Sequence, residues 1–381
     1  MRILIGSLTY PLRNGVTASI NVSADGFLAA GHEIRIIAPD YGLGRARPEH
    51  CPVPHSIVGQ FLLSLLARED KDERMFAWNA PSHIRRLVRQ FEPDAFWLHT
   101  VTWAPNAFER VMLASPKAKV LTYHTAVEIY GRIYAGELGA RQMISRAKSL
   151  ANRVDRVITP SAMIAKTLIS YGIRTPISVI PTGLNSPPKS YSKAELAKRF
   201  DFAADRPLLL YVGRVTREKN IKSLFAMLND LRRLKTEATL LLVGPGDLEL
   251  VEQDAGGHKV ADLTVFTGAL PRADAQACYG GADAFVFASK TETQGLVISE
   301  AMLSGTPVVA LDSPIRDEVY PEQIAKVVGN EAEFARAVRE VIQDKKLRER
   351  LVKAARAYTR ERFSIEQMIA KQISLFAQAI K

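Results

Sequence analysis

Two basic side chains and two carboxylates form the pattern in this sequence that could carry chemistry. Arg214 and Lys219 follow an apolar segment, whereas Glu292 precedes and Glu300 lies within a helical pattern that opens at Gly295. Guanidinium and ammonium groups bind phosphate, and a helix start adds unpaired backbone N–H groups and a partial positive charge. Neighbouring carboxylates would accept hydrogen bonds from hydroxyl groups, as on a ribose or a hexose. The set therefore predicts a site for a sugar attached to a diphosphate.

Each of these residues also has an ordinary interpretation. A Glu before a helix offsets the helix dipole, a Glu on a helix is usually solvated, and two cations on a loop are common surface residues. Their coincidence favours function, because Gly-Arg ends a predicted strand, a Lys follows five residues later and the Glu pair comes after another strand. A departing diphosphate gains negative charge, so we expect loss of one cation to raise the barrier by about 2–4 kcal/mol, by analogy with lost oxyanion donors.

The chain alternates between short apolar segments and helical patterns, and this alternation indicates an α/β fold with parallel sheets. A dense Pro/Gly/Ser stretch at 181–190 predicts the linker between two such halves. Strands are predicted at 2–7, 33–38, 95–99, 120–124, 154–161 and 177–180, and then at 207–213, 239–243, 263–266, 284–288 and 307–311. Helices are predicted at 16–30, 82–91, from about 131 to about 152, 221–234 and 295–305, and through most of the chain after 331.

Ligands of open parallel sheets bind beyond the carboxyl ends of the strands. The residues that follow the predicted strands include Gly15, His99, His124 and the segment 244–246, besides the cations and Glu292. Two sheets that face one another would bring these loops together across a cleft.

Length and composition limit the class of protein. A chain of 381 residues exceeds one ordinary core, which predicts two domains. Its 47% apolar and 24% charged residues are typical of a soluble globular protein, and no apolar run approaches the 18 or so residues that cross a bilayer. The start shows no signal peptide, and Cys51 and Cys278 lie too far apart in sequence to suggest a zinc site or a disulfide framework. We therefore expect a cytoplasmic protein.

The net charge of +11 lies mainly in the first half, where residues 1–184 hold 22 Lys and Arg against 14 Asp and Glu. Such an excess indicates an anionic membrane face, a nucleic acid or an acidic substrate as partner, or simply a basic soluble protein. No nucleic-acid reading motif accompanies the charge, so we predict no nucleic acid. The basic helical stretch from about 131 to about 152 could lie on lipid or dock on the sheet. The apolar run 61–66 is either core or an exposed face that dips into lipid, and core is the preferred interpretation. Asp70-Lys71-Asp72 is rejected as a metal motif because it lies in a solvated charge run.

Longer motifs connect these residues to a known family. They are Gly213-Arg214 with Glu218-Lys219-Asn220, the E-x7-E spacing from Glu292 to Glu300, its continuation through 301–309, and Tyr123-His124-Thr125 followed by Glu128 and Tyr130. Along nearly its whole length the chain resembles the retaining glycosyltransferases of family GT4, which have the GT-B fold. Within that family it most resembles the diacylglycerol glycosyltransferases and also the sulfoquinovosyl transferases.

The resemblance implies an architecture of two Rossmann-like, doubly wound domains that face each other across a cleft. Residues 1–184 would form the acceptor-binding domain and residues 185–360 the nucleotide-sugar-binding domain, with a final helix at 361–381 that packs back on the first domain. It also implies sugar transfer with retention from a nucleotide sugar, such as a UDP-sugar, with no obligatory metal and with a diphosphate oxygen that takes the acceptor proton.

The resemblance assigns a role to each candidate residue. Glu292 would hold the hydroxyl groups of the donor sugar, Glu300 would hold those of the ribose, and His124 would lie near the anomeric carbon. Arg214 and Lys219 would bind the diphosphate. The further donor-binding positions would be Gly15, Gly213, Gly268, Gly295, Leu296 and Val297. The first loop has Arg13-Asn14-Gly15 where many members have two glycines, Gly244-Pro245-Gly246-Asp247 replaces the usual Gly-Asp-Gly-Pro, and Leu184-Asn185 replaces Ile-Asp.

Three functions remain in competition. The first is transfer of a hexose or hexuronic acid to a lipid such as diacylglycerol by a peripheral enzyme at the inner membrane face. The second is transfer to a soluble, lipopolysaccharide or phosphatidylinositol acceptor, for example by a mannosyltransferase. The third is a non-catalytic GT-B subunit, which the intact cations and carboxylates oppose.

Overall fold

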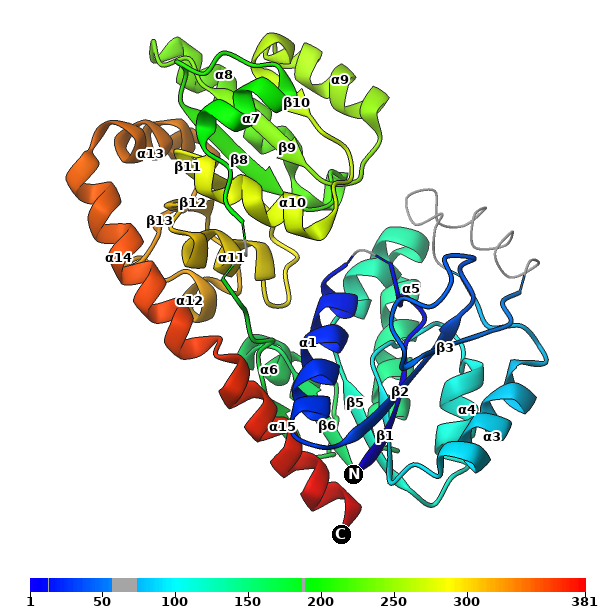
Figure 1. Cartoon of the computed structure of the whole chain (residues 1–381). Coiled ribbons are helices and arrows are strands. Elements are labelled where there is room, and N and C mark those ends of the chain that lie inside the picture. Colours follow the sequence, from blue (N-terminus) through cyan, green and yellow to red (C-terminus); the bar gives the residue numbers. More distant parts are fainter. Residues whose placement is uncertain (13, 57–73, 187–188) are drawn as a thin grey trace. The chain divides into compact units, whose positions relative to one another are not determined.

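The computed structural model describes residues 1–12, 14–56, 74–186 and 189–381, and these residues form two compact units. Unit 1 comprises Met1–Gly183 together with Ile365–Lys381, and unit 2 comprises Leu184–Ser364. Each unit is an α/β layer structure built on one parallel sheet (Figure 1), which confirms the predicted fold class. Arg13, the apolar run 61–66 and the triplet 70–72 lie outside the described residues.

The sheet of unit 1 has seven strands in the order β3-β2-β1-β4-β5-β6-β7, and every neighbouring pair is parallel. Chain order reverses between β1 and β4, so this is the point where the loops at the carboxyl edge diverge and leave a crevice. The strands are β1 (Arg2–Gly6), β2 (Glu33–Pro39), β3 (His50–Val53), β4 (Ala95–Leu98), β5 (Ala118–Thr122), β6 (Arg156–Thr159) and β7 (Ile177–Val179).

Helices cover both faces of this sheet and close a hydrophobic core on each. On one face Phe27 and Phe376 pack against Trp97, and on the other Phe96 packs against Phe108. The first face is covered by α1 (Gly15–Ala29) and α15 (Ile365–Ile380). The second is covered by α3 (Ala80–Phe91), α4 (Ala107–Leu113), α5 (Val127–Ala151) and α6 (Ala162–Ser170).

Unit 2 repeats the architecture with six parallel strands in the order β10-β9-β8-β11-β12-β13, and its reversal point lies between β8 and β11. The strands are β8 (Leu208–Val212), β9 (Thr239–Val243), β10 (Thr264–Phe266), β11 (Ala284–Phe287), β12 (Val308–Leu311) and β13 (Lys326–Val328). The helices are α7 (Lys193–Phe200), α8 (Ile221–Arg233), α9 (Leu248–Gly257), α10 (Arg272–Ala277), α11 (Leu296–Ser304), α12 (Arg316–Val319), α13 (Glu331–Gln343) and α14 (Lys345–Arg362). Short 3-10 turns lie at Arg217–Lys219, Ala261–Leu263 and Cys278–Gly281.

Several elements differ from the sequence prediction. The long helix predicted from about 131 to about 152 begins earlier, at Val127, and is broken inside α5, because Gly136 has a φ of 61°. Strands β3 and β13 were not predicted, since each is short and only partly buried. The last helix begins at Ile365 rather than at 361. The first residues of the predicted linker pack into unit 1, where Thr182 Oγ1 and Ser19 Oγ form a buried hydrogen bond of 3.1 Å.

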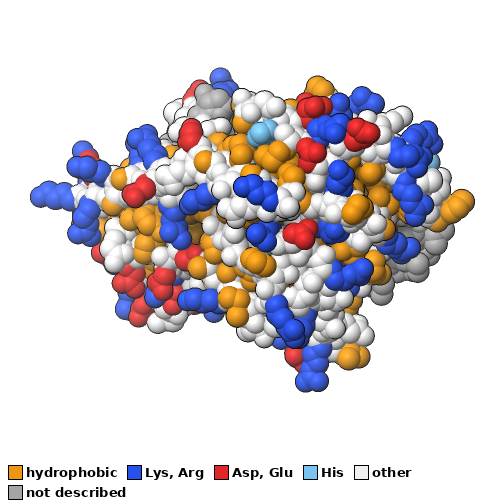
Figure 2. Space-filling view, turned by 90° about the horizontal axis from the view of Figure 1, so that it is seen from below, with side chains coloured by type: hydrophobic (Ala, Val, Ile, Leu, Met, Phe, Trp, Pro, Cys, Tyr) orange, Lys and Arg blue, Asp and Glu red, His pale blue; other side chains and the backbone are white. Residues whose placement is uncertain are grey.

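Charged side chains are dispersed over the surface that Figure 2 shows. Lys and Arg side chains lie across the face seen from below, with hydrophobic and fewer acidic side chains between them. No helix in the described part of the chain combines the length and the apolar character needed to span a bilayer.

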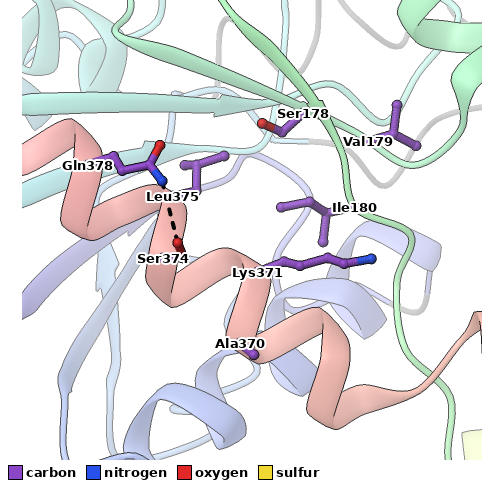
Figure 3. Close-up of a pocket in the computed structure, with 8 residues that line it drawn as sticks. All are labelled: Ser178, Val179, Ile180, Ala370, Lys371, Ser374, Leu375 and Gln378. Atoms are coloured by element: carbon purple, nitrogen blue, oxygen red, sulfur yellow. Dashed lines mark hydrogen bonds between the residues drawn. The ribbon is translucent and has the colours of Figure 1, made fainter.

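A cavity of about 560 Å³ lies in unit 1 between the edge strand β7 and α15 (Figure 3). Leu375 and Ile180 supply apolar walls, and Lys371, Ser374 and Gln378 supply polar groups. None of its eight lining residues belongs to the predicted site.

Candidate active site

The predicted cations and Glu292 come together at the reversal point of the unit 2 sheet. Arg214 and Lys219 lie in the loop that follows β8, and Glu292 lies in the loop that follows the neighbouring strand β11. Two hydrogen bonds join these loops directly. Asn220 Nδ2 donates to the carbonyl oxygen of Ala288 at 3.3 Å, and Thr291 Oγ1 donates to that of Glu218 at 3.5 Å. Because both strands are parallel and adjacent, the site occupies the crevice where open α/β sheets bind ligands.

Both cations are held by carboxylates. Lys219 Nζ lies 2.8 Å from Glu292 Oε1, and both side chains are largely buried. Arg214 Nη2 donates to Glu218 Oε1 one turn later in the same loop. Ion pairs of this kind fix the side chains before a ligand binds, so a diphosphate would meet cations already in place rather than flexible surface groups.

The backbones of the loops after β8 and β9 lie in close contact. Gly213 N donates to the carbonyl oxygen of Val243, and Gly244 N donates to that of Gly268. A Cβ added at Gly244 would lie 1.9 Å from the carbonyl oxygen of Gly213, and both glycines have φ near 150°. Only glycine fits at Gly244, so the loops after β8, β9 and β10 form one tight edge beside the cations.

Helix α11 begins at this edge with no side-chain cap. Its N-cap residue Gly295 has φ 64° and ψ 49°, and among the described residues the first N–H that bonds back to it is that of Ile298. The N–H groups of Leu296 and Val297 belong to the first turn, where backbone donors have no partner within the helix. Glu292 lies three residues before Gly295, so the helix start and the carboxylate belong to one loop.

Glu300 lies on α11 and is 8% exposed, in a separate hydrogen-bonded cluster. Its Oε1 accepts from Arg272 Nη2 at 2.7 Å and from Gln276 Nε2 at 3.0 Å, and its Oε2 accepts from the hydroxyl group of Tyr279 at 3.1 Å. Burial, followed by the charge of Glu300, raises the pKa of Tyr279 well above its usual value, so the phenol stays a donor. Three donors orient the carboxylate. Arg272, whose side chain is half exposed, is the donor that a hydroxyl group of a ligand could replace most easily.

Unit 1 places the predicted histidines at its own carboxyl edge. His99 Nδ1 and His124 Nε2 are 2.9 Å apart, and the two rings stack with centroids 5.1 Å apart. Burial lowers the pKa of His124 to about 4, and burial followed by the charge of His124 lowers that of His99 well below its usual value. At neutral pH both rings are uncharged, so one ring donates this hydrogen bond to the other, and the contact with His99 orients His124.

Gly15 is the first residue of α1, where the side chain of Asn14 caps the helix by accepting from Thr17 N. Gly15 and the histidines belong to unit 1, whereas the cations and carboxylates belong to unit 2. The expectation that the two sets meet across a cleft stays a prediction.

Sequence reasoning missed several partners. Glu218 was part of a motif without an assigned role, and Arg272, Gln276 and Tyr279 were not singled out. Arg272 opens the helix after β10, so its position beyond a carboxyl end was a usable signal. The other contacts depend on which side chains the fold brings together. Among the described residues, no three His, Cys, Asp or Glu side chains gather as a potential metal site.

Two family models match the chain in succession. The model described as Glycosyltransferase Family 4 matches residues 13–186, and the model described as Glycosyl transferases group 1 matches residues 192–358. Alpha-monoglucosyldiacylglycerol synthase of Streptococcus pneumoniae is 27% identical over 66% of this chain, which spans only 59% of that relative. A GDP-mannose-dependent alpha-mannosyltransferase of Mycolicibacterium smegmatis is 27% identical over 84% of this chain and 82% of its own length.

A solved structure agrees with these matches at the level of the fold. Sucrose-phosphate synthase of Thermosynechococcus elongatus superimposes with a TM-score of 0.81 over 99% of this chain and 98% of its own, at 19% identity. The two matched regions fall on the two parallel-sheet units. The chain belongs to the glycosyltransferases of family 4, which have the GT-B fold.

Proposed function

We propose that this protein is a retaining glycosyltransferase that moves a hexose or hexuronic acid from a UDP-sugar to a membrane lipid such as diacylglycerol. The observation that carries the proposal is the ion pair of Lys219 with Glu292 beside Arg214, at the reversal point of the unit 2 sheet. The lipid acceptor is supported by the synthase relative, whose name states a glycolipid product. The enzyme would act at the inner face of the cell membrane, as a cytoplasmic peripheral protein.

The roles follow from charge. Arg214 and Lys219 would neutralise the diphosphate as the glycosidic bond breaks and negative charge grows on the leaving group. The first N–H groups of α11, at Gly295, Leu296 and Val297, would add donors to the same oxygens. Gly213 and Gly268 would let the backbone approach the nucleotide closely. Gly15 at the start of α1 would bring the first loop to the donor phosphate or the acceptor.

The carboxylates and the histidine would position the sugars. Once a diphosphate draws Lys219 away, Glu292 can accept from the donor-sugar hydroxyl groups, and Glu300 can take ribose hydroxyl groups when Arg272 yields. Because its pKa is about 4, His124 would be neutral near the anomeric carbon and would orient the sugar rather than carry charge. A diphosphate oxygen would take the acceptor proton, and the reaction would need no obligatory metal.

A donor panel tests the proposal. Purified protein is incubated with UDP-glucose, UDP-galactose, UDP-glucuronate or GDP-mannose and with vesicles that contain diacylglycerol, and products are identified by mass. We expect a glycosyl-diacylglycerol from one UDP-sugar, and we expect Glu292→Ala to abolish it while the fold is retained. Glu249→Ala, an exposed glutamate of unit 2, is the matched control and should keep full activity.

A second candidate is a GDP-mannose-dependent mannosyltransferase that uses another acceptor. The mannosyltransferase relative, 82% of whose length the chain covers, favours it. Product from GDP-mannose alone would select this candidate. Full activity of Glu292→Ala would contradict both.

A further inference from the structure

Large apolar side chains are exposed at one edge of the unit 1 sheet. Leu43 follows β2, Met75 and Trp78 lie between β3 and α3, and Trp103 follows β4. Leu138 begins the second segment of α5, which returns from the carboxyl edge toward β6. Because β2 to β5 are parallel, the loops after them leave from the same edge of the sheet. We call these five residues the apolar rim.

The exposure of the rim is unusual for side chains of this kind. Trp78 is 93% exposed and Leu138 is 68% exposed, whereas Trp97 is 1% exposed in the core. A single exposed apolar residue is normal, but several at the ligand-binding edge of a sheet indicate an interaction surface. Tryptophan, with an apolar ring and one N–H donor, is enriched at the boundary between water and lipid.

Cations follow two of the rim residues along the chain. Helix α3, which starts two residues after Trp78, carries Arg85, Arg86 and Arg89, all exposed, and contains no acidic residue. Arg45 is exposed two residues after Leu43. Within the described ranges none of these four guanidinium groups takes part in an ion pair. Exposed apolar rings together with unpaired cations complement a surface that is apolar inside and negatively charged outside.

We propose that the apolar rim docks unit 1 on an anionic phospholipid bilayer, with Trp78 and Trp103 inserted at the level of the headgroups. The arginines of α3 and Arg45 contact the anionic headgroups, and each adds to the attraction within a Debye length of the surface. The inference deepens the proposed function, on which it rests for the lipid acceptor, because it places the acceptor-binding edge of unit 1 at the membrane.

The chain supplies its own optical probe. It contains three tryptophans, Trp78, Trp97 and Trp103, and Trp97 is buried, so any vesicle-dependent change in emission reports the two rim tryptophans. Full-length protein is titrated with vesicles of phosphatidylcholine and phosphatidylglycerol, with and without brominated acyl chains. We expect a blue shift and bromine quenching that weaken with salt and are absent with pure phosphatidylcholine.

Matched variants locate the contact. The double variant Trp78→Ser, Trp103→Ser should weaken vesicle binding by tenfold or more in a flotation assay. The triple variant Arg85→Gln, Arg86→Gln, Arg89→Gln should weaken it by a similar factor and flatten its salt dependence. The control Ile169→Ser, Leu248→Ser removes two other exposed apolar residues, away from the rim, and should bind as wild type. All variants should keep the UDP affinity and the circular dichroism of wild type, since the cations of the proposed donor site are untouched.

The outcomes separate the two proposals. No vesicle-dependent change in emission, or equal loss in the Ile169/Leu248 control, overturns the docking surface. A dimer in sedimentation equilibrium that Trp78→Ser dissociates also overturns it, because the rim would then be an interface between copies of the chain. Vesicle binding that depends on the rim, without glycosyl transfer to any lipid, supports the docking surface while the proposed function fails.

Discussion

At the scale of single residues, Lys219 and Glu292 depend on each other. Both side chains are less than a fifth exposed, so removal of one partner leaves a largely buried charge. We expect Lys219→Met to lower the free energy of unfolding by about 2–3 kcal/mol and to weaken UDP binding by tenfold or more, because a diphosphate contact is lost as well.

Urea unfolding and calorimetric titration with UDP measure the two effects. Lys222→Met is the control, because Lys222 also pairs with an acidic residue, Asp254, but is 58% exposed. Lys222→Met should lower the free energy of unfolding by less than about 1 kcal/mol and leave the affinity for UDP unchanged. An unchanged UDP affinity in Lys219→Met would remove Lys219 from the donor site.

The histidine pair predicts a loss of stability in acid. Burial holds the pKa of His124 at about 4, whereas in the unfolded chain it is near 6.5. Between these values the unfolded state binds more protons, so stability is complete above pH 6.5 and falls as the pH drops toward 4, by on the order of 3 kcal/mol from His124. Urea midpoints from pH 7.5 to 4.5 measure it. His124→Asn should flatten the profile relative to His258→Asn, and parallel profiles would contradict the assignment.

At the scale of elements, the start of α11 depends on Gly295. A side chain at this residue would adopt a left-handed conformation and approach Ile315 Cδ1 to 2.9 Å. Gly295→Ala should therefore lower the free energy of unfolding by about 1–2 kcal/mol and displace the first N–H groups of the helix. We expect weaker UDP binding in titration calorimetry. Gly256→Ala is the control, because a Cβ there meets nothing within 4 Å, and equal losses in both variants would argue against a special role for the α11 start.

The elements that sequence reasoning predicted are those with a strong local pattern. The apolar segments 208–212 and 284–287 are buried along their whole length, and Gly213 and Gly295, in the loops that follow them, have the positive φ that glycine adopts most readily. The sequence pattern did not predict the features that depend on tertiary contacts. The break at Gly136 and the short strand β13 leave no clear periodic signal. Pairings such as Arg272 with Glu300 join residues 28 positions apart, so only the fold reveals them.

At the scale of the whole molecule, the last helix completes the core of unit 1. Phe376 is fully buried between Trp97 and Phe27, with ring centroids 4.9 and 5.6 Å away. Phe376→Ala should destabilise unit 1 by about 3–5 kcal/mol, and the proposed donor site in unit 2 should keep its affinity for UDP. In scanning calorimetry with and without UDP, the variant should lower the midpoint temperature of the unit 1 transition. The midpoint of the transition that UDP stabilises should stay unchanged. Equal lowering of both transitions would show that the units unfold together.

The chain passes from unit 1 to unit 2 after Gly183 and returns after Ser364, and these two crossings are neighbours. Leu184 N donates to the carbonyl oxygen of Phe363 at 2.9 Å, and a Cβ on Gly183 would lie 2.7 Å from Ile365 Cα. Unit 2 is thus a domain inserted into unit 1 at a single position, and its two ends lie next to each other. A gene that encodes only Leu184–Ser364 should therefore yield a domain that folds by itself. A short linker that joins Gly183 to Ile365 should give a continuous unit 1 chain without a change in its fold.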